Sequence, residues 1–233
     1  MAKQTIPSTK QAVQGKVPRL IDLVNEYKTY WIPFVKELLR QTKAGANGNQ
    51  NYCERIAKGL HTTNAKWNAP TKWLKCVDSK SLSGLKTIPR CSHQRCIANT
   101  TINNFIKDLL NSNILNNTYN VFEDLYDDVN KLRRSGLGDL FIYDATIRIG
   151  YDKGILPSKY EYLHSGALKG AKLLAKRGVL NLRKYTSNPT WKLHKYHRIP
   201  TVEFSNLLPG MKAIDIEVFL CIAKQYFPTM LIP

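Results

Sequence analysis

The segment Ser135–Gly150, which reads S-G-L-G-D-L-F-I-Y-D-A-T-I-R-I-G, constrains the fold of this chain more than any other. Its two glycines around one apolar residue predict a very tight turn. Residues 121–134, before the turn, have a helical period whose apolar face is formed by Phe122, Leu125, Val129 and Leu132. Residues 140–149, after Asp139, are apolar almost all round and predict a buried helix. The expected order is therefore helix, glycine turn and buried helix.

The remaining sequence also predicts mainly helices. Expected elements are a helix over 19–43 with a kink at Pro33, a loop over 44–51, a short helix over 52–60, a helix over 102–110 capped by Asn99-Thr100-Thr101, a loop over 154–158, a helix over 159–177 ended by Gly178, and an amphipathic closing helix over 215–226. The fold class is thus all-α (mainly), a multi-helix domain with long basic loops. We expect a flexible basic arm over 1–18 and a single mainly helical domain over 19–233.

Positive charge flanks the glycine turn and points to a polyanionic partner. The chain has 233 residues and a net charge of +18. Residues 1–100 hold 17 basic and 5 acidic side chains, for a net charge of +12, and residues 151–200 hold 11 and 2, for +9. Residues 101–150 have a net charge of −2. Concentrated positive charge favours binding to a phosphate backbone through counterion release. The alternative is a generally basic or ribosome-associated protein.

Three stretches carry the candidate backbone contacts. Residues 61–100 interleave basic groups, including Arg95, with Trp67 and Trp73, which suits base stacking or, equally, a loop sealed onto the core. Within 159–177, Lys169, Lys172 and Lys176 share one stripe of a helix. Residues 179–198 form an acid-free basic and aromatic loop or short hairpin that contains Arg183, Lys184, Lys192 and Lys195.

Gly136-Leu137-Gly138 followed by a buried helix resembles the helix-hairpin-helix element of DNA-binding proteins, including DNA glycosylases of base-excision repair. The resemblance covers residues 121–177. It implies that the turn, through Gly136, Leu137 and Gly138, and the N-terminus of the second helix hold one DNA phosphate, because unpaired N–H groups and the helix dipole favour an anion. We further expect a Cβ at Gly138 to obstruct the backbone or a close approach.

A second similarity to the glycosylases follows the buried helix. In that family a loop leads to a V-D-T-H motif whose aspartate is catalytic; here Leu156-Pro157 leads to Glu161-Tyr162-Leu163-His164. His164 thus matches the histidine, Tyr162 stands in place of the aspartate, and Leu140 stands where bifunctional members have a lysine. The resemblance implies a hydrolase of N-glycosidic bonds with an altered site.

Within that altered site, Asp144 is the candidate carboxylate. His164 would orient a water molecule or the leaving base, Lys169 would hold a phosphate, and Tyr162 would complete the group. The alternative for Asp144 is an ion pair with Arg148, four residues along the same helix.

The sequence predicts neither a cofactor nor a metal site, and no membrane span. Cys91-Ser-His-Gln-Arg-Cys96, with Cys76 upstream, matches the ligand pairs of structural zinc poorly. Five irregularly spaced cysteines and the lack of a signal peptide favour an intracellular protein, cytoplasmic or in the nucleoid or nucleus.

Two functions remain open from the sequence. One is a DNA glycosylase-like repair enzyme with an altered site. The other is a non-catalytic protein that binds the backbone of DNA or RNA, with duplex DNA favoured. A deep pocket beside His164 favours the first, and a flat basic surface favours the second.

Overall fold

The computed structural model describes residues 17–59, 73–74, 96–182, 192–193 and 196–231. The fold is mainly helical, as predicted. Its helices are α1 (Leu20–Glu26), α2 (Ile32–Ala44), α3 (Gly48–Lys58), α4 (Asn99–Asn111), α5 (Phe122–Lys131), α6 (Asp139–Lys153), α7 (Ser165–Lys176) and α9 (Ala213–Ala223), with a π-helical segment η1 (Tyr27–Trp31) and a 3₁₀ turn η4 (Thr201–Phe204). Three short strands complete it: β1 (Tyr160–Leu163), β2 (Lys192–Leu193) and β3 (Tyr196–Pro200).

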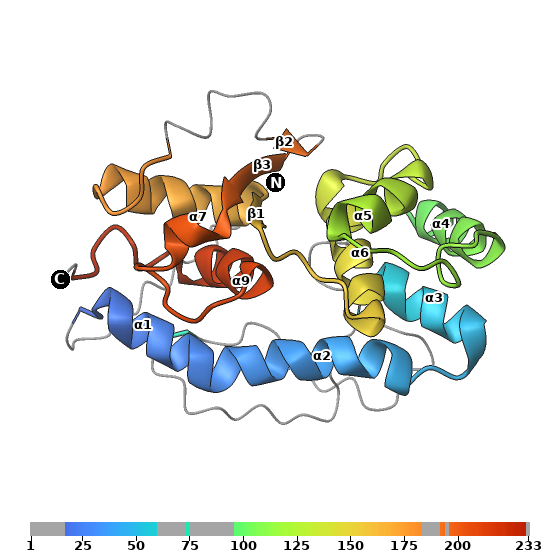
Figure 1. The fold of residues 1–233 in the computed structure, drawn as a ribbon, viewed down its shortest axis with the longest axis horizontal. Helices are drawn as coiled ribbons and strands as arrows, with labels where there is room; N and C mark the ends of the chain where they lie inside the picture. Colours follow the sequence, from blue (N-terminus) through green and yellow to red (C-terminus); the bar gives the residue numbers. More distant parts are fainter. Residues whose placement is uncertain (1–16, 60–72, 75–95, 183–191, 194–195, 232–233) are drawn as a thin grey trace, which may run out of the picture.

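The helices gather around two hydrophobic cores, which define two lobes. The α6 lobe contains α3, α4, α5 and α6. The α9 lobe contains α1, α7, α9 and the sheet. Figure 1 shows the stretch from α1 through α2 running along one edge of the molecule, beneath α7 and α9 first and then beneath the α6 lobe. That stretch contributes Leu23 and Tyr27 to the α9 lobe and packs Leu39 against the other core.

The predicted kink at Pro33 takes the form of a π-helical segment that ends just before it. Pro33 has no backbone N–H to donate to the preceding turn. The helix therefore widens over Tyr27–Trp31 and returns to α-helical geometry at Ile32.

α6 is buried on nearly every side, as the sequence predicted. Its buried side chains include Ile142, Ala145, Thr146 and Ile149. Phe141 of its first turn meets Phe105 of α4 edge-to-face, with ring centroids 4.9 Å apart. This contact fixes the start of α6 against the neighbouring helix.

Several predicted boundaries were wrong. Residues 160–163, expected in a helix, form β1, which pairs antiparallel with β3. Residues 48–51, expected in a loop, form the first turn of α3. Asn99-Thr100-Thr101 do not cap α4; α4 begins at Asn99, and Ala98 precedes it without a side-chain cap.

α9 is not the amphipathic closing helix that the sequence predicted. It buries Ile214, Ile216, Phe219 and Leu220 together with Asp215. α7 covers it closely, because Gly166 and Gly170 face it: a Cβ at Gly170 would lie 2.2 Å from the Leu220 carbonyl oxygen. By contrast, Gly178 ends α7 as predicted, with a φ of +73°.

Candidate nucleic-acid interface and buried acidic cluster

The turn between α5 and α6, residues 132–138, has one position that requires glycine. Gly136 has a φ of +89°, a conformation that residues with a Cβ rarely adopt. Leu137 is buried in the α6 lobe, and its N–H donates to the Arg134 carbonyl oxygen at 3.0 Å. Gly136 lies over Thr101 of α4. The turn is thus anchored on one side and exposed on the other.

Gly138 is the N-cap of α6, and its environment contradicts the backbone part of the expectation, while the close approach of a ligand stays a prediction. Its φ of −76° and ψ of 169° are open to any residue, and beyond its chain neighbours a Cβ there would meet no atom of the described residues within 4 Å. The first N–H groups of α6 have no acceptor inside the helix, and Gly138, as N-cap, has no side chain to cap them. The protein itself therefore does not require glycine at this position.

Basic side chains surround the turn, and sequence reasoning missed them although K-L-R-R directly precedes the glycines. Arg133 pairs with Asp139, the first residue of α6, at 2.5 Å, and so ties the two ends of the turn together. Arg134 reaches Asp108 of α4 with Nε–Oδ2 and Nη2–Oδ1 distances of 2.6 and 2.7 Å. Lys131 pairs with Asp128 within α5.

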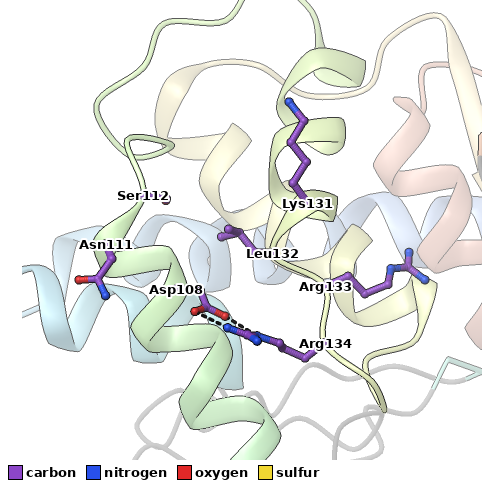
Figure 2. Close-up of a pocket in the computed structure, with 7 residues that line it drawn as sticks. All are labelled: Asp108, Asn111, Ser112, Lys131, Leu132, Arg133 and Arg134. Carbon is purple, nitrogen blue, oxygen red and sulfur yellow. Dashed lines mark hydrogen bonds and ion pairs between the residues drawn. The ribbon is translucent and has the colours of Figure 1, made fainter.

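An open hollow of about 450 Å³ lies beside these groups, as Figure 2 shows. It lies between the last turns of α4 and α5, and its lining is basic on balance. The lining residues are Asp108, Asn111, Ser112, Lys131, Leu132, Arg133 and Arg134. An anionic group of moderate size is the ligand that such a lining favours.

The predicted lysine stripe lies on the outer face of α7. Lys169, Lys172 and Lys176 are all exposed, while the glycine face of the same helix packs on α9. The stripe belongs to the α9 lobe and the glycine turn to the α6 lobe (Figure 1). In the described part of the chain, the lysine stripe and the glycine turn therefore lie on different lobes.

The other predicted basic residues are mostly beyond the described part of the chain. Arg95, Arg183, Lys184 and Lys195 lie outside it, together with Trp67, Cys76 and Cys91. Lys192 begins β2. In the described residues no three His, Cys, Asp or Glu side chains are grouped so as to hold a metal ion.

Trp73 lies against the core. Its ring meets Tyr226 edge-to-face at 6.2 Å, and its backbone N–H donates to the Glu26 carboxylate. Leu74 beside it is buried. For Trp73, these contacts match the interpretation of a loop sealed onto the core.

The structure brings three of the four predicted catalytic residues near one another. The ring of Tyr143 contacts those of Tyr162 and His164, and the charge of Asp144 reaches His164. Tyr162 is fully buried, and its hydroxyl donates to Glu123. Burial, and then the hydrogen bond to Glu123, raise the pKa of Tyr162. Lys169 is exposed on α7. Asp144 lies 3.7 Å from Arg148, the ion pair that the sequence offered as the alternative.

His164 has a buried carboxylate partner that the sequence did not predict. Its Nε2 lies 2.7 Å from Oε1 of Glu217 on α9, and both side chains are at least nine-tenths buried. Burial opposes protonation of His164, but the charge and hydrogen bond of Glu217, and the charge of Asp144, leave its pKa raised. The pair is therefore a buried, charge-assisted hydrogen bond between α7 and α9.

Two further carboxyl groups, those of Glu161 and Asp215, belong to the same acidic cluster as Glu217, and neither had a predicted role. Glu161 of β1 is completely buried, and among the described residues its carboxyl oxygens receive no side-chain hydrogen bond. Burial, and then the charges of Glu217 and Asp215, raise the pKa of Glu161 well above its usual range. Burial therefore favours the protonated form of Glu161. The sequence signal for this buried acidic cluster was Asp215-Ile216-Glu217, which places two acidic residues inside the apolar run of α9.

Comparison with known proteins gave no relatives: no family model, curated protein sequence or solved structure matches the chain. Among the described helices, none combines the length and apolar character needed to cross a bilayer.

Proposed function

We propose that this protein binds nucleic acid, with duplex DNA favoured, through the backbone phosphates, and that the α5–α6 turn makes the central contact. The observation that carries the proposal is Gly138: it stands at the start of a buried 15-residue helix, uncapped and open to solvent on the side where a Cβ would point. Exposed N–H groups at a helix start attract a phosphate. The basic groups of the turn and the chain's net charge of +18 add long-range attraction.

The lysine stripe of α7 supports the same proposal from the second lobe. Its three exposed lysines recur at helical spacing on one side of the helix. Such contacts are independent of base sequence, since they reach phosphates rather than base edges. The protein would therefore bind many sequences with similar affinity.

The non-catalytic binder is the better supported of the two functions. Asp144 is paired with Arg148, Tyr162 is held in the core by Glu123, and His164 is paired with Glu217. Each group has a structural partner, and the hollow of Figure 2 lies at α4 and α5 rather than beside His164. A repair-type hydrolysis would need a carboxylate directed toward a bound sugar.

The central test places one charge at Gly138. Asn and Asp are both favourable N-cap residues, so Gly138→Asn and Gly138→Asp keep α6 and differ only in charge. We expect Gly138→Asp to weaken binding to a 20-base-pair duplex roughly tenfold relative to Gly138→Asn, because a carboxylate would repel the phosphate. Fluorescence anisotropy at several salt concentrations measures both affinity and its salt dependence.

The control is Asn47→Asp, which makes the same change at the exposed N-cap of α3. We expect it to alter affinity by less than about twofold, as a distant charge does. Wild-type affinity in both Gly138 variants would remove the turn from the interface. Lack of duplex binding by the wild-type protein at low salt would refute the function itself.

A further inference from the structure

The three basic residues beside the hollow are held by acids in different ways. Asp128 and Asp139, the partners of Lys131 and Arg133, belong to the α5–α6 segment itself. Arg134 is held by Asp108, which lies 26 residues away on α4. Figure 2 shows Lys131 and Arg133 pointing away from this pair, while Arg134 reaches across toward α4.

The Asp108–Arg134 pair is accessible to a competing anion. The side chain of Arg134 is 54% exposed, and that of Asp108 is 23% exposed. An ion pair at this exposure contributes little to stability, so its replacement by another partner costs the fold little. A phosphate offers the arginine the same paired geometry as a carboxylate and carries at least as much charge.

We propose that the hollow receives a backbone phosphate of the bound nucleic acid and that Arg134 exchanges Asp108 for this phosphate on binding. This inference rests on the proposed function and adds a second contact, distinct from the start of α6. Asp108 then acts as an internal competitor, because it occupies Arg134 in the absence of ligand. Asp108 thereby lowers the affinity of the hollow for any anion that must take Arg134 from it.

The lowered pKa of Asp108, caused by the hydrogen bonds from Arg134, agrees with this arrangement, because it keeps the competing carboxylate charged at every physiological pH. The turn also contacts α4 at two places: Gly136 lies over Thr101, and Arg134 pairs with Asp108. These two positions are seven residues apart, so about 10 Å of helix separates them. The hollow and the tip of the turn are thus separate points on one surface.

The chain contains a matched control pair. Arg40 and Glu37 on α2 form the same two-bond arrangement, with both N–O distances at 2.8 Å and side chains 59% and 40% exposed. This pair is distant from the α5–α6 turn. The turn lies at the N-terminal end of α6, whereas α2 meets the C-terminal end of α6, where Lys43 pairs with Asp152. Glu37→Gln and Asp108→Asn therefore make the same change in net charge and each release one arginine.

The experiment compares binding to the same duplex by fluorescence anisotropy as salt is varied. We expect Asp108→Asn to raise affinity at least threefold, because Arg134 no longer has to leave Asp108. The slope of log affinity against log salt should stay nearly unchanged, because Arg134 neutralises the same phosphate in both proteins. Arg134→Ala should lower affinity three- to tenfold. The double variant should match Arg134→Ala, since Asp108 acts through Arg134.

Several outcomes would overturn the inference while leaving the function intact. One is an equal effect of Glu37→Gln and Asp108→Asn, which would make the gain a matter of net charge. Another is unchanged affinity in Arg134→Ala. A gain from Asp108→Asn that persists without Arg134 would also exclude the exchange. If no variant binds the duplex at low salt, the proposed function itself fails. Thermal unfolding by circular dichroism establishes that each variant is folded.

Discussion

At the scale of single residues, the two glycines of the turn have different roles. Gly136 has a left-handed backbone, whereas Gly138 has an extended one that any residue adopts. Only Gly136 is therefore required by the fold. Gly138 is dispensable to the fold and, under the proposed function, is kept free of a side chain by the ligand.

This difference predicts opposite effects on stability. Gly136→Ala should lower the free energy of unfolding by about 1–2 kcal/mol, the cost of a left-handed conformation with a Cβ. Gly138→Asn should leave it unchanged or slightly higher, because Asn is a better N-cap. Urea unfolding followed by circular dichroism measures both. Equal losses of unfolding free energy in the two variants would mean that neither position of the turn tolerates a side chain, whatever its backbone conformation.

Glu161 predicts a dependence of stability on pH. Its pKa is raised on folding, so the folded state keeps a proton that the unfolded chain loses above a pH of about 4.3. Its contribution to stability is therefore full below that pH and is lost as pH rises toward the folded-state pKa. The loss is about 1.4 kcal/mol per pH unit while only the folded state holds the proton.

Glu161→Gln keeps the shape of the side chain and does not ionise. Relative to wild type, the variant should become steadily more stable as pH rises above the ordinary glutamate pKa of about 4.3, until the folded-state pKa of Glu161 is reached. Unfolding by urea at each pH gives the difference directly, and the raised pKa of His164 cancels in it because both proteins contain that pair. A difference that stays constant with pH would show that Glu161 is ionised in the folded protein.

At the scale of elements, the tight contact between α7 and α9 depends on the glycines of α7. The segment Gly166-Ala167-Leu168-Lys169-Gly170 turns its two glycines toward α9, which brings the helices close and leaves the lysines outside. Packing and charge are thus divided between two sides of one helix. This arrangement explains why the lysine stripe stays exposed although α7 is central to its lobe.

Gly170→Ala should lower the free energy of unfolding by about 1–3 kcal/mol, because its Cβ would meet the Leu220 carbonyl oxygen and force the helices apart. Ala is otherwise the better helix former by about 1 kcal/mol, so a stabilised variant would show that the contact is loose. Gly138→Asn serves as a control, since it adds a larger side chain in open space. Thermal unfolding of the three proteins makes the comparison.

The sequence predicted those elements whose determinants are local. The turn at Gly136, the burial of α6 and the end of α7 at Gly178 follow from nearby residues and were confirmed. β1 could not be predicted in this way, because its partner β3 begins 33 residues after β1 ends and pairs with it only in the fold. The burial of α9 was missed for a related reason: Asp215 and Glu217 appear to be surface charges in sequence but are enclosed by other elements.

The candidate site was predictable to a similar extent. The glycine turn and the exposed lysines of α7 could be named in advance. The partners of Arg134 and His164 could not, since Asp108 and Glu217 come from distant helices. Pairings between distant side chains depend on tertiary packing, which a sequence period does not report.

At the scale of the whole molecule, two hydrophobic cores are connected by elements that contribute residues to both. The α1–α2 stretch borders both lobes, and β1 lies between them. Positive surfaces occur on each lobe, at the α5–α6 turn and on α7. A duplex that reached both would be held at two separated places, so its orientation as well as its affinity would be set by the protein.

The alternation of side chains along β1 has a consequence for sequence change. Tyr162 packs in the core of the α6 lobe, while Leu163 packs in that of the α9 lobe and Glu161 meets the acids of α9. Successive residues of a strand point to opposite faces. Deletion or insertion of one residue inside β1 would therefore exchange the two sets, placing a carboxyl group among tyrosines and a tyrosine beside buried acids. The length of β1 is therefore fixed by the two cores that it borders.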